Sequence, residues 1–408
     1  MHRAGAHVVG PLLSLESAHS QWVPCPCGAE AHFHSRRPRR LLTALGMVEF
    51  ERAYYICPHC RQGHSPRDRE LDVEGTQCSP GVRRMLALVG SESSFEQSRE
   101  QLELLAGLEV TAKAVERQAE GIGADIAAGE HEEIRRAQQL ELPQVCTPTV
   151  PILYIEMDGT GVPVVTAETE GRAGKIEGVP AHTREVKLGC VFTQTTTDKE
   201  GRPVRDEDST TYTGAIETAE EFGLRLYTEA WRRGWSRANK KVVIGDGAVW
   251  IWNLADQHFP GAIQIVDLYH SRQHLWELSA KLFPNHERDR KRWMGRGLGR
   301  LDQGKIEALV KILRDLHPAN AELAKIVGNE ADYFQRNAAR MRYPAFRAQG
   351  LFVGSGVVEA GCKTVVATRL KRSGMFWTVR GANAIIALRC CRLNRRFEDY
   401  CAARSSAA

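Results

Sequence analysis

The sequence predicts a multidomain protein of mixed α/β structure. At 408 residues the chain is too long for one ordinary hydrophobic core, so two or three domains are expected. Two apolar runs rich in β-branched residues, which end at Asp158 and Asp246, indicate strands buried on both faces. Long stretches of helical period surround these runs, and two cysteine pairs precede them.

The first of these runs, Ile152 to Val165, contains an acid that packing does not explain. Its sequence ILYIEMDGTGVPVV begins as a buried strand, and the turn residues after Asp158 predict a hairpin to a second strand at Val162. Charged groups are rarely buried unless they are paired or bind a metal. The pattern returns where Asp246 lies between two glycines. Two such strand ends predict a site for a divalent cation.

The composition predicts an intracellular protein without a membrane-spanning segment. No stretch approaches the roughly 20 apolar residues that cross a bilayer, and Met1 to Gln21 lacks the pattern of a signal peptide. Eleven cysteines, an odd number, argue against a disulfide framework in such a chain. The expected location is the cytoplasm, in association with the nucleoid.

Residues 1–67 are predicted to hold a zinc ribbon. Two cysteine-containing turns, CPC at 25–27 and CPHC at 57–60, flank a strand-like segment. Four thiolates suit a closed tetrahedral Zn²⁺ site. The predicted ligands of this structural zinc ion are Cys25, Cys27, Cys57 and Cys60. The first pair is one residue shorter than usual, so nearby histidines are substitute ligands: His32, His34, His59 and His64. Two unrelated turns are the alternative.

Residues 68–142 are predicted to be helical, with an outline that fits a DNA-binding helix-turn-helix. Pro80 suits a first helical turn, Gly107 interrupts the pattern and Thr111 can cap the next helix. Any antiparallel pair of helices fits this outline equally well. Four cations favour DNA binding: Arg83, Arg84, Lys113 and Arg117. Three prolines between residues 142 and 151 then predict a linker.

The order of elements in residues 151–283 predicts a ribonuclease H-like core. Three strands, with Arg184 to Gln194 as the third, precede a helix that Thr213 is expected to cap. A strand, a helix, a strand and a helix follow, which is the chain order of such a mixed sheet packed by helices. Residues 284–350 keep a helical period and are predicted to be an all-helical insertion. Residues 351–408 then complete the core and end in a basic helix.

Three carboxylates are the predicted catalytic and metal-binding groups: Asp158, Asp246 and Glu359. Glu359 lies in a helix that Ser355 is expected to cap. Carboxylate oxygens suit Mg²⁺ or Mn²⁺, and two such ions can hold the attacking and leaving oxygens of a phosphodiester. Glu156 lies on the same strand face as Asp158 and is an alternative ligand, although it is deeper in the apolar run.

Asp267 and His270, which follow a further strand, are additional catalytic candidates. A helix-capping aspartate and a core histidine are the alternative. Ten basic residues against two acids between Lys363 and Ala408 suit a polyanion such as DNA, with a solvated helix face as the alternative. The predicted DNA contacts are Lys363, Arg369, Lys371, Arg372 and Arg380. Trp250, Trp252 and Trp377 are candidates for stacking on bases or for core packing.

Several of these segments combine into a set of motifs. They are DGTG at 158–161, IGDG at 244–247, DLYH at 267–270, GSGVVEAGCK at 354–363 and RLKRSGMFW at 369–377. This set resembles bacterial insertion-sequence transposases of the ISKra type, which are similar to the wider Mutator-like group. The resemblance covers about residues 151–400. It implies a DDE transposase with a ribonuclease H-like core and a helical insertion before the glutamate.

By that similarity Asp158, Asp246 and Glu359 would form the catalytic triad, and Asp267 with His270 would match the group's acid/Cys-x-x-His signature. The expected function is metal-dependent cleavage of element ends and their joining to target DNA. Double-stranded DNA is the expected partner, and the pairing of two ends predicts a homodimer or larger complex. A non-catalytic DNA-binding regulator and a ribonuclease H-like nuclease are the alternatives. The regulator would lack one of the three carboxylates, and all three are present.

Overall fold

The computed structural model describes residues 2–15, 20–141, 149–174, 180–318 and 320–407. Residue contacts divide the chain into one unit of residues 1–127 with 383–408 and a second unit of residues 128–382. Both contain helices and strands, as the mixed α/β prediction requires. Residues 383–408 belong to the first unit, whereas the sequence placed them with the core. Residues 142–148 of the predicted linker lie outside the described residues.

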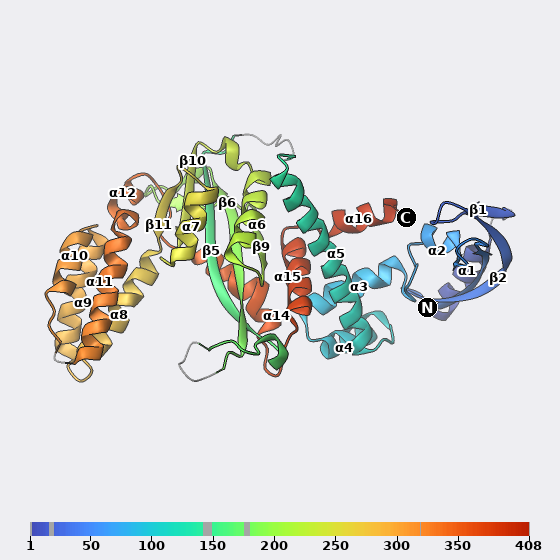
Figure 1. The fold of residues 1–408 in the computed structure, drawn as a ribbon, viewed down its shortest axis with the longest axis horizontal. Helices are drawn as coiled ribbons and strands as arrows, with labels where there is room; N and C mark the ends of the chain where they lie inside the picture. Colours follow the sequence, from blue (N-terminus) through green and yellow to red (C-terminus); the bar gives the residue numbers. More distant parts are fainter. Residues whose placement is uncertain (1, 16–19, 142–148, 175–179, 319, 408) are drawn as a thin grey trace. The chain divides into compact units, whose positions relative to one another are not determined.

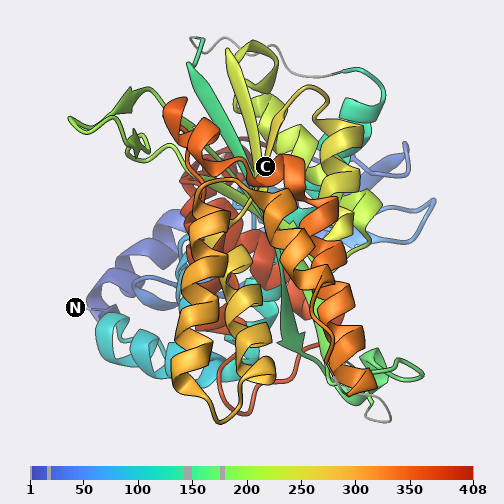
Figure 2. The same ribbon diagram turned by 90° about the vertical axis from the view of Figure 1, so that its left-hand side faces the viewer.

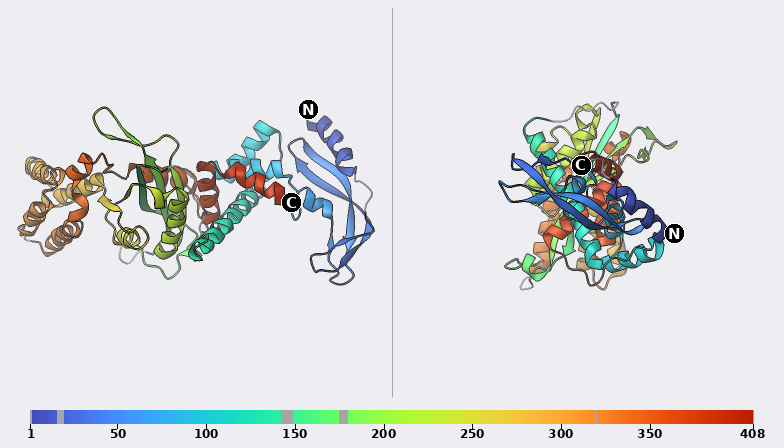
Figure 3. Two further views of the ribbon diagram at one scale, coloured as in Figure 1. Left: turned by 90° about the horizontal axis from the view of Figure 1, so that it is seen from above. Right: turned by 90° about the vertical axis from the view of Figure 1, so that its right-hand side faces the viewer.

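A four-stranded antiparallel sheet begins the first unit, in the order β1-β2-β3-β4. Its strands are β1 (Trp22–Pro24), β2 (Glu30–Thr43), β3 (Gly46–Ile56) and β4 (Gly63–His64). The long strands β2 and β3 pair along their length and curve together (Figure 3). Val48 and Phe50 of β3 are buried while Glu49 and Glu51 are exposed, which is the period of two expected for a sheet with one covered face. Helix α1 (His2–Ser14) packs against β3.

Helices make up the rest of the first unit. They are α2 (Pro66–Glu70), α3 (Pro80–Glu92), α4 (Phe95–Ala106), α5 (Ala112–Gln138), α15 (Val379–Leu393) and α16 (Phe397–Ala407), of which α5 and α15 continue into the second unit. The side chain of Ser79 caps α3, and Gly107 ends α4 with a φ of 59°. At Gly123 of α5 a Cβ would lie 2.0 Å from the carbonyl oxygen of Ala384. Glycine at this position therefore allows α5 and α15 to approach closely.

Much of the positive charge assigned to DNA in this unit is paired with acids. Arg389 is 2% exposed and donates to Glu92 at 2.8 Å, and Arg404 donates to Asp125 at 2.7 Å. The prediction that the C-terminal cations as a group meet a polyanion is therefore wrong for Arg389, which is buried, whereas for the exposed Arg404 it stays a prediction. Three of the four helix-turn-helix cations are also in ion pairs: Arg83 with Asp72, Arg84 with Glu398 and Lys113 with Glu116.

A five-stranded mixed sheet forms the centre of the second unit, in the order β11-β10-β5-β6-β9. Its strands are β5 (Ile152–Pro163), β6 (Thr183–Gln194), β9 (Thr211–Ala215), β10 (Lys240–Gly245) and β11 (Ile263–Val266). β5, β10 and β11 are parallel, whereas β6 is antiparallel to both β5 and β9. Residues 152–157 are all buried, so the apolar run that predicted a central strand is confirmed.

Two details of the predicted strand order are wrong. There is no hairpin within 152–165, because β5 continues through Asp158 to Pro163 and pairs with β6 along this length. Thr213 lies in β9 and caps no helix. Thr218 caps α6 (Ala219–Arg232) in a reciprocal capping box with Glu221. Three strands still precede the first helix, but the third is β9. The small strands β7 (Thr196–Thr197) and β8 (Pro203–Val204) form a separate pair.

Helices cover both faces of this sheet (Figure 1). A Cβ at Gly189 would meet Leu226 of α6, whereas the preceding residue, Leu188, lies against Gly361. Because successive residues of a strand point to opposite faces, α6 and α13 (Gly356–Gly361) lie on opposite sides of the sheet. Helix α7 (Val249–His258) packs on α6 and brings Ile251 against Gly245.

The remaining helices follow β11. They are α8 (Leu268–Leu282), α9 (Glu287–Asp302), α10 (Ile306–Arg314), α11 (Ala321–Arg336) and α12 (Tyr343–Ala348). Helices α9 to α11 run alongside one another (Figure 2), and the described residues of 284–350 contain no strand, as the helical period predicted. After α13 the chain forms a π-helical segment, η4 (Cys362–Ala367), and a short helix α14 (Thr368–Leu370). In the described residues, no helix has both the length and the apolar character to span a bilayer.

Removal of the buried Arg225 guanidinium should destabilise the second unit. Arg225 is 4% exposed and holds Glu217 at 2.7 Å and Glu130 at 2.6 Å. Arg225→Ala leaves these carboxylates without their cation, and we expect a loss of about 3–5 kcal/mol in the free energy of unfolding, measured by denaturant titration. The control is Arg314→Ala in α10 of the same unit. Its exposed pair with Asp332 should contribute under about 1 kcal/mol, and equal losses would contradict the prediction.

Candidate functional site

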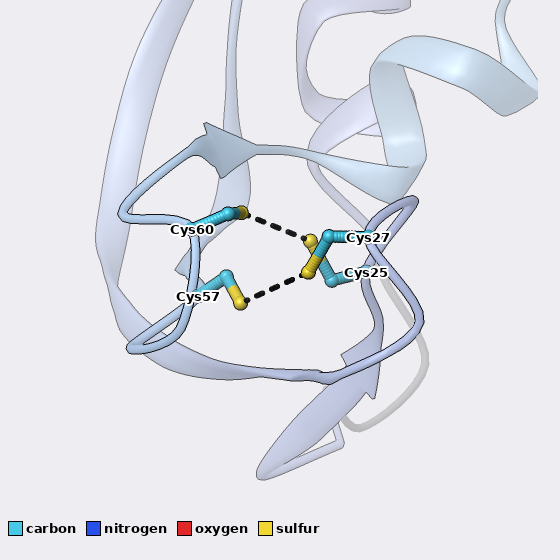
Figure 4. Close-up of side chains that lie close together, drawn as sticks. All are labelled: Cys25, Cys27, Cys57 and Cys60. Carbon is cyan, nitrogen blue, oxygen red and sulfur yellow. Dashed lines mark hydrogen bonds between the residues drawn. The ribbon is translucent and has the colours of Figure 1, made fainter.

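Four cysteines from two turns of the first unit come together (Figure 4). Cys25 and Cys27 lie between β1 and β2, and Cys57 and Cys60 lie between β3 and β4. Sγ of Cys25 is 3.6 Å from Sγ of Cys60, and Sγ of Cys27 is 3.7 Å from Sγ of Cys57. Four sulfurs bound tetrahedrally at about 2.3 Å from Zn²⁺ would be about 3.8 Å apart. The thiols therefore fit a structural zinc ion.

The turns that carry these thiols are built to hold them. The N–H of Cys25 donates to Ala29 O at 2.8 Å and the N–H of Cys57 donates to Gln62 O at 2.9 Å, so each turn is closed by its own backbone. The backbone N–H groups of Cys60 and His59 lower the pKa of Cys57 to about 6, whereas burial and hydrogen bonds with the other three thiols raise the pKa of Cys25. A thiolate is the form that binds metal. Both cysteines of the short first turn thus belong to the cluster of possible zinc ligands. The four histidines considered as substitute ligands lie outside this cluster.

The predicted acids lie at neighbouring strand ends of the second unit. β10 pairs in parallel with β5, with Ile244 opposite Glu156, so Asp246 follows β10 at the level of Asp158. β11 pairs with β10 up to Val266, and Asp267 comes next in the chain. Parallel strands thus bring Asp158, Asp246 and Asp267 to one edge of the sheet, although Asp158 itself lies within β5 rather than at its end.

Glu359 reaches the same region from the far end of the chain, because two buried carboxylates hold the start of its helix. Oε2 of Glu156 accepts a hydrogen bond from Val358 N at 2.8 Å. Asp267 accepts hydrogen bonds from the backbone N–H and, at 2.7 Å, from the Oγ of Ser355. Glu156 and Asp267 are both completely buried. Asp267 thus holds the residue just before α13 and Glu156 holds the third residue of the helix, which places Glu359 beside β5.

These contacts revise three expectations. Ser355 precedes α13 but makes no side-chain cap, because its Oγ binds Asp267. Asp267 caps α8 by accepting from His270 N at 2.7 Å, and its other oxygen is taken by Ser355. Of the two roles considered for Asp267, these contacts favour the helix cap over direct action on a substrate, because both carboxylate oxygens are already bound. Glu156 serves α13 and does not substitute for Asp158; the sequence showed its position but not a partner 202 residues away.

His270 lies beside the acids and connects them to the helical region. Its backbone N–H donates to Asp267 Oδ1 at 2.7 Å, and its Nε2 is 3.3 Å from Nε2 of His274. Nδ1 of His274 is 2.8 Å from Oε2 of Glu330, and the ring of His274 stacks on the ring of Tyr333. The hydroxyl of Tyr333 donates to Asp246 O at 2.9 Å. Helices α8 and α11 thus support both Asp246 and His270.

The electrostatics of Asp158 fit a cation. Burial raises its pKa and the charge of Asp246 raises it further, while Gly159 N and the thiol of Cys362, at 3.4 Å, oppose this by donating to its oxygens. Facing like charges favour a bound cation. Among the described residues, however, the four cysteines are the one group of three or more possible ligands whose atoms all lie within 4.8 Å of one another. Asp158, Asp246 and Glu359 share a region without meeting that distance.

A cavity of about 860 Å³ opens beside Glu359. Tyr269, Arg347 and Gly354 are among its lining residues. Tyr269 is 64% exposed and packs against Gly354, where a Cβ would be 3.0 Å from its ring. The sequence offered tryptophans for stacking on bases, yet Trp252 and Trp377 are buried and serve the core. Exposed aromatic residues at this end of the sheet were missed because no local pattern distinguishes them.

The predicted DNA contacts divide by exposure. Lys363, Lys371 and Arg380 are exposed and Arg372 is partly exposed. Arg369 is completely buried, with its guanidinium 4.9 Å from the centre of the Trp377 ring. A phosphate contact by Arg369 is therefore wrong, because its cation packs on an indole inside the unit. Lys371 Nζ donates a hydrogen bond to Thr160 Oγ1, which places this cation two residues along β5 from Asp158.

Comparison with known proteins assigns a family. The family described as an uncharacterised protein family, UPF0236, matches residues 30–398. The chain belongs to this family. No curated protein matches. Among solved structures, the chain is similar to the Drosophila P element transposase strand transfer complex, at 8% sequence identity and a TM-score of 0.25, with 83% of each chain covered. A likeness this weak carries no argument about fold or activity.

Loss of one thiol should remove the metal and unfold the ribbon. In small zinc domains, metal binding supplies about 10 kcal/mol or more of folding free energy. Cys57→Ser should therefore abolish stoichiometric zinc, measured by colorimetric release, and expose residues 22–64 to protease. Cys78→Ser removes a partly buried thiol outside the cluster and should leave zinc bound. Full zinc content in the Cys57 variant would contradict the assignment.

Glu156 should be replaceable by glutamine but not by alanine. Burial raises the pKa of Glu156 to about 8, and Oε1 has no hydrogen-bond partner among the described residues, so a neutral amide resembles the group in place. Glu156→Ala leaves Val358 N unpaired, which costs about 1–3 kcal/mol in the free energy of unfolding, before any cavity term. Glu156→Gln should retain most of that stability.

Glu185→Ala, at an exposed position of β6, is the control and should change stability by under about 0.5 kcal/mol. Denaturant unfolding of all three variants measures the difference. Equal stability of the alanine and glutamine variants at position 156 would show that the bond to Val358 contributes nothing.

Proposed function

We propose that this protein is a DDE transposase of the ISKra type, which cleaves the ends of an insertion sequence and joins them to target DNA. The observation that carries the proposal is the convergence of Asp158, Asp246 and the Glu359 helix at one edge of the central sheet. These residues are the ones that the sequence motifs single out by resemblance.

The sheet supports a ribonuclease H-like core. In chain order, three antiparallel strands, β5, β6 and β9, are followed by two strands parallel to the first. The first strand is central, and helices cover both faces. The helices between α8 and α13 then separate the last carboxylate from the first two, as the proposed insertion requires.

The acids support metal-dependent phosphoryl transfer. Asp158, Asp246 and Glu359 would hold Mg²⁺ or Mn²⁺, which would activate the attacking oxygen and stabilise the leaving oxygen of a phosphodiester. Glu359 is exposed, and the hydrogen bond that Ser355 Oγ donates to it is long, at 3.5 Å, so its carboxylate is weakly held and can turn toward a cation. Glu156 and Asp267 position its helix, and His270, which follows Asp267 at the start of α8, would hold a phosphate or share a proton.

The exposed cations support DNA as the substrate. Lys363, Lys371 and Arg380 lie between residues 360 and 380, a stretch without a single acid. Phosphate contacts of this kind supply most of the sequence-independent affinity for DNA. A homodimer or larger complex would bring two element ends together. The cysteine cluster would bind structural zinc, and the helices α3 to α5 would contribute to end recognition.

Asp158→Asn tests the proposal. The assay uses a supercoiled plasmid that carries the coding region with its natural flanking DNA, incubated with the full chain in Mg²⁺. Even outer-shell metal partners contribute roughly 10–100-fold, so loss of a direct ligand should lower strand cleavage by about 100-fold or more while DNA binding persists.

The matched control is Asp256→Asn, the same change at an exposed position of α7, which should cleave normally. Joined products separate a transposase from a nuclease that only hydrolyses. Normal cleavage by the Asp158 variant would remove this residue from the mechanism, and no cleavage by the unaltered chain would favour the non-catalytic regulator.

A further inference from the structure

One large apolar side chain in the cationic stretch faces solvent. Phe376 is 66% exposed, in the loop between α14 and α15. The next residue, Trp377, is 6% exposed. An exposed phenyl ring carries an unfavourable hydration free energy, and the fold gains nothing visible from it. Its position therefore calls for a role outside the folding of this unit.

The loop holds this ring in a defined place. Trp377 N donates to Pro163 O at 3.1 Å, and Val165 N donates to Trp377 O at 2.9 Å, so the loop is paired with the chain just beyond β5. The indole N–H of Trp377 donates to Leu370 O at 3.1 Å. Trp377 forms a β-bridge with Val164, and successive residues of paired chain point in opposite directions. The buried indole thus directs the phenyl ring of Phe376 outward.

The surroundings of the ring select its partner by charge. No acid occurs in the sequence between Ala360 and Arg380, and Lys371, Arg372 and Arg380 all lie within five residues of Phe376. One carboxylate from elsewhere, Glu168, reaches this loop and accepts a hydrogen bond from Val379 N at 2.9 Å, so cations outnumber acids around the ring. Lys371 also contacts Thr160, so the loop and the acid site share the strand β5. An apolar tip among cations suits a polyanion that has an apolar interior. Duplex DNA has that chemistry, with phosphates outside and stacked bases within.

We propose that Phe376 is a wedge that inserts between stacked base pairs of DNA held by Lys371, Arg372 and Arg380. Such a wedge unstacks one step and kinks the duplex, and the neighbouring cations hold the phosphates on either side. This inference rests on the proposed function for the choice of DNA. It adds the residue that deforms the duplex and the place where the deformation occurs.

The geometry also limits how far the kink lies from the reacting phosphate. Pro163 and Val165, which hold the loop, are five and seven residues beyond Asp158. At about 3.3–3.4 Å per residue, that places the loop roughly 16–24 Å along the strand from Asp158. At about 3.4 Å per base pair, the kink falls within about seven base pairs of the phosphate at the acid site.

The test is a binding measurement that requires no cleavage. A fluorescent 30-bp duplex, intact or with one central abasic site, is titrated with the full chain in EDTA and followed by anisotropy. An abasic site lowers the free energy needed to open a base step, so the unaltered chain should bind it at least tenfold more tightly than the intact duplex. Phe376→Ala should reduce that preference to less than twofold, and Phe376→Trp should retain it.

Lys371→Ala is the control for simple charge. It should weaken binding to both duplexes by the same factor and lower the salt dependence, without changing the preference. Because Phe376 is exposed, its variants should keep the melting temperature of the unaltered chain.

Three outcomes would overturn the proposal: a preference that survives in Phe376→Ala, the absence of any preference in the unaltered chain, or loss of self-association rather than of DNA preference, which would make the ring an interface between copies. Cleavage is a separate readout. A Phe376-dependent preference without cleavage in Mg²⁺ would reject the transposase and leave the wedge, whereas cleavage without the preference would do the reverse.

Discussion

The candidate site depends on two hydrogen-bonded carboxylates that never reach solvent. Glu156 lies in the middle of β5 and accepts a hydrogen bond from a backbone N–H at the start of α13. Asp267 follows the end of β11 and accepts a hydrogen bond from the backbone N–H just before α13. An unpaired buried polar group is expensive, so this arrangement tolerates little displacement of the helix. It fixes a segment that lies about two hundred residues downstream of β5 against the edge of the sheet where Asp158 and Asp246 emerge. Without that attachment, Glu359 would belong to a different region of the unit.

Acidic and basic residues both lie at this edge of the sheet. Acids gather where the parallel strands end, and the cations of residues 363–380 follow immediately after Glu359 in the chain. Lys371 connects the two groups, because its Nζ donates a hydrogen bond to Thr160 of β5, two residues beyond Asp158. A phosphodiester needs both: cations along its backbone, and oxygen ligands where it reacts. The arrangement is therefore coherent as chemistry on a nucleic acid, even though each charged residue taken alone has an ordinary structural explanation.

Sequence reasoning succeeded where the physical signal is local. A nearly continuous apolar run identified β5, and the spacing and chemistry of the thiols identified the cysteine cluster. It failed where distant partners decide. The glycines after Asp158 read as a turn, but β6 supplies hydrogen bonds that keep β5 extended through them. The short strand β9 looked like the start of a helix, because its pairing with β6 is invisible in the sequence. Charge alone assigned Arg369 to DNA, although a tryptophan eight residues later covers it.

The π-helical segment η4 also sets the direction of Arg369. Each extra residue in a helical turn rotates everything that follows by about 100° relative to an ordinary α-helix. Residues 368–370 are consequently rotated about the helix axis relative to Glu359. A regular helical wheel that starts at the glutamate therefore places Arg369 on the wrong face of the helix. The angular offset turns that arginine inward, where its guanidinium packs on Trp377 and supports the loop that carries Phe376.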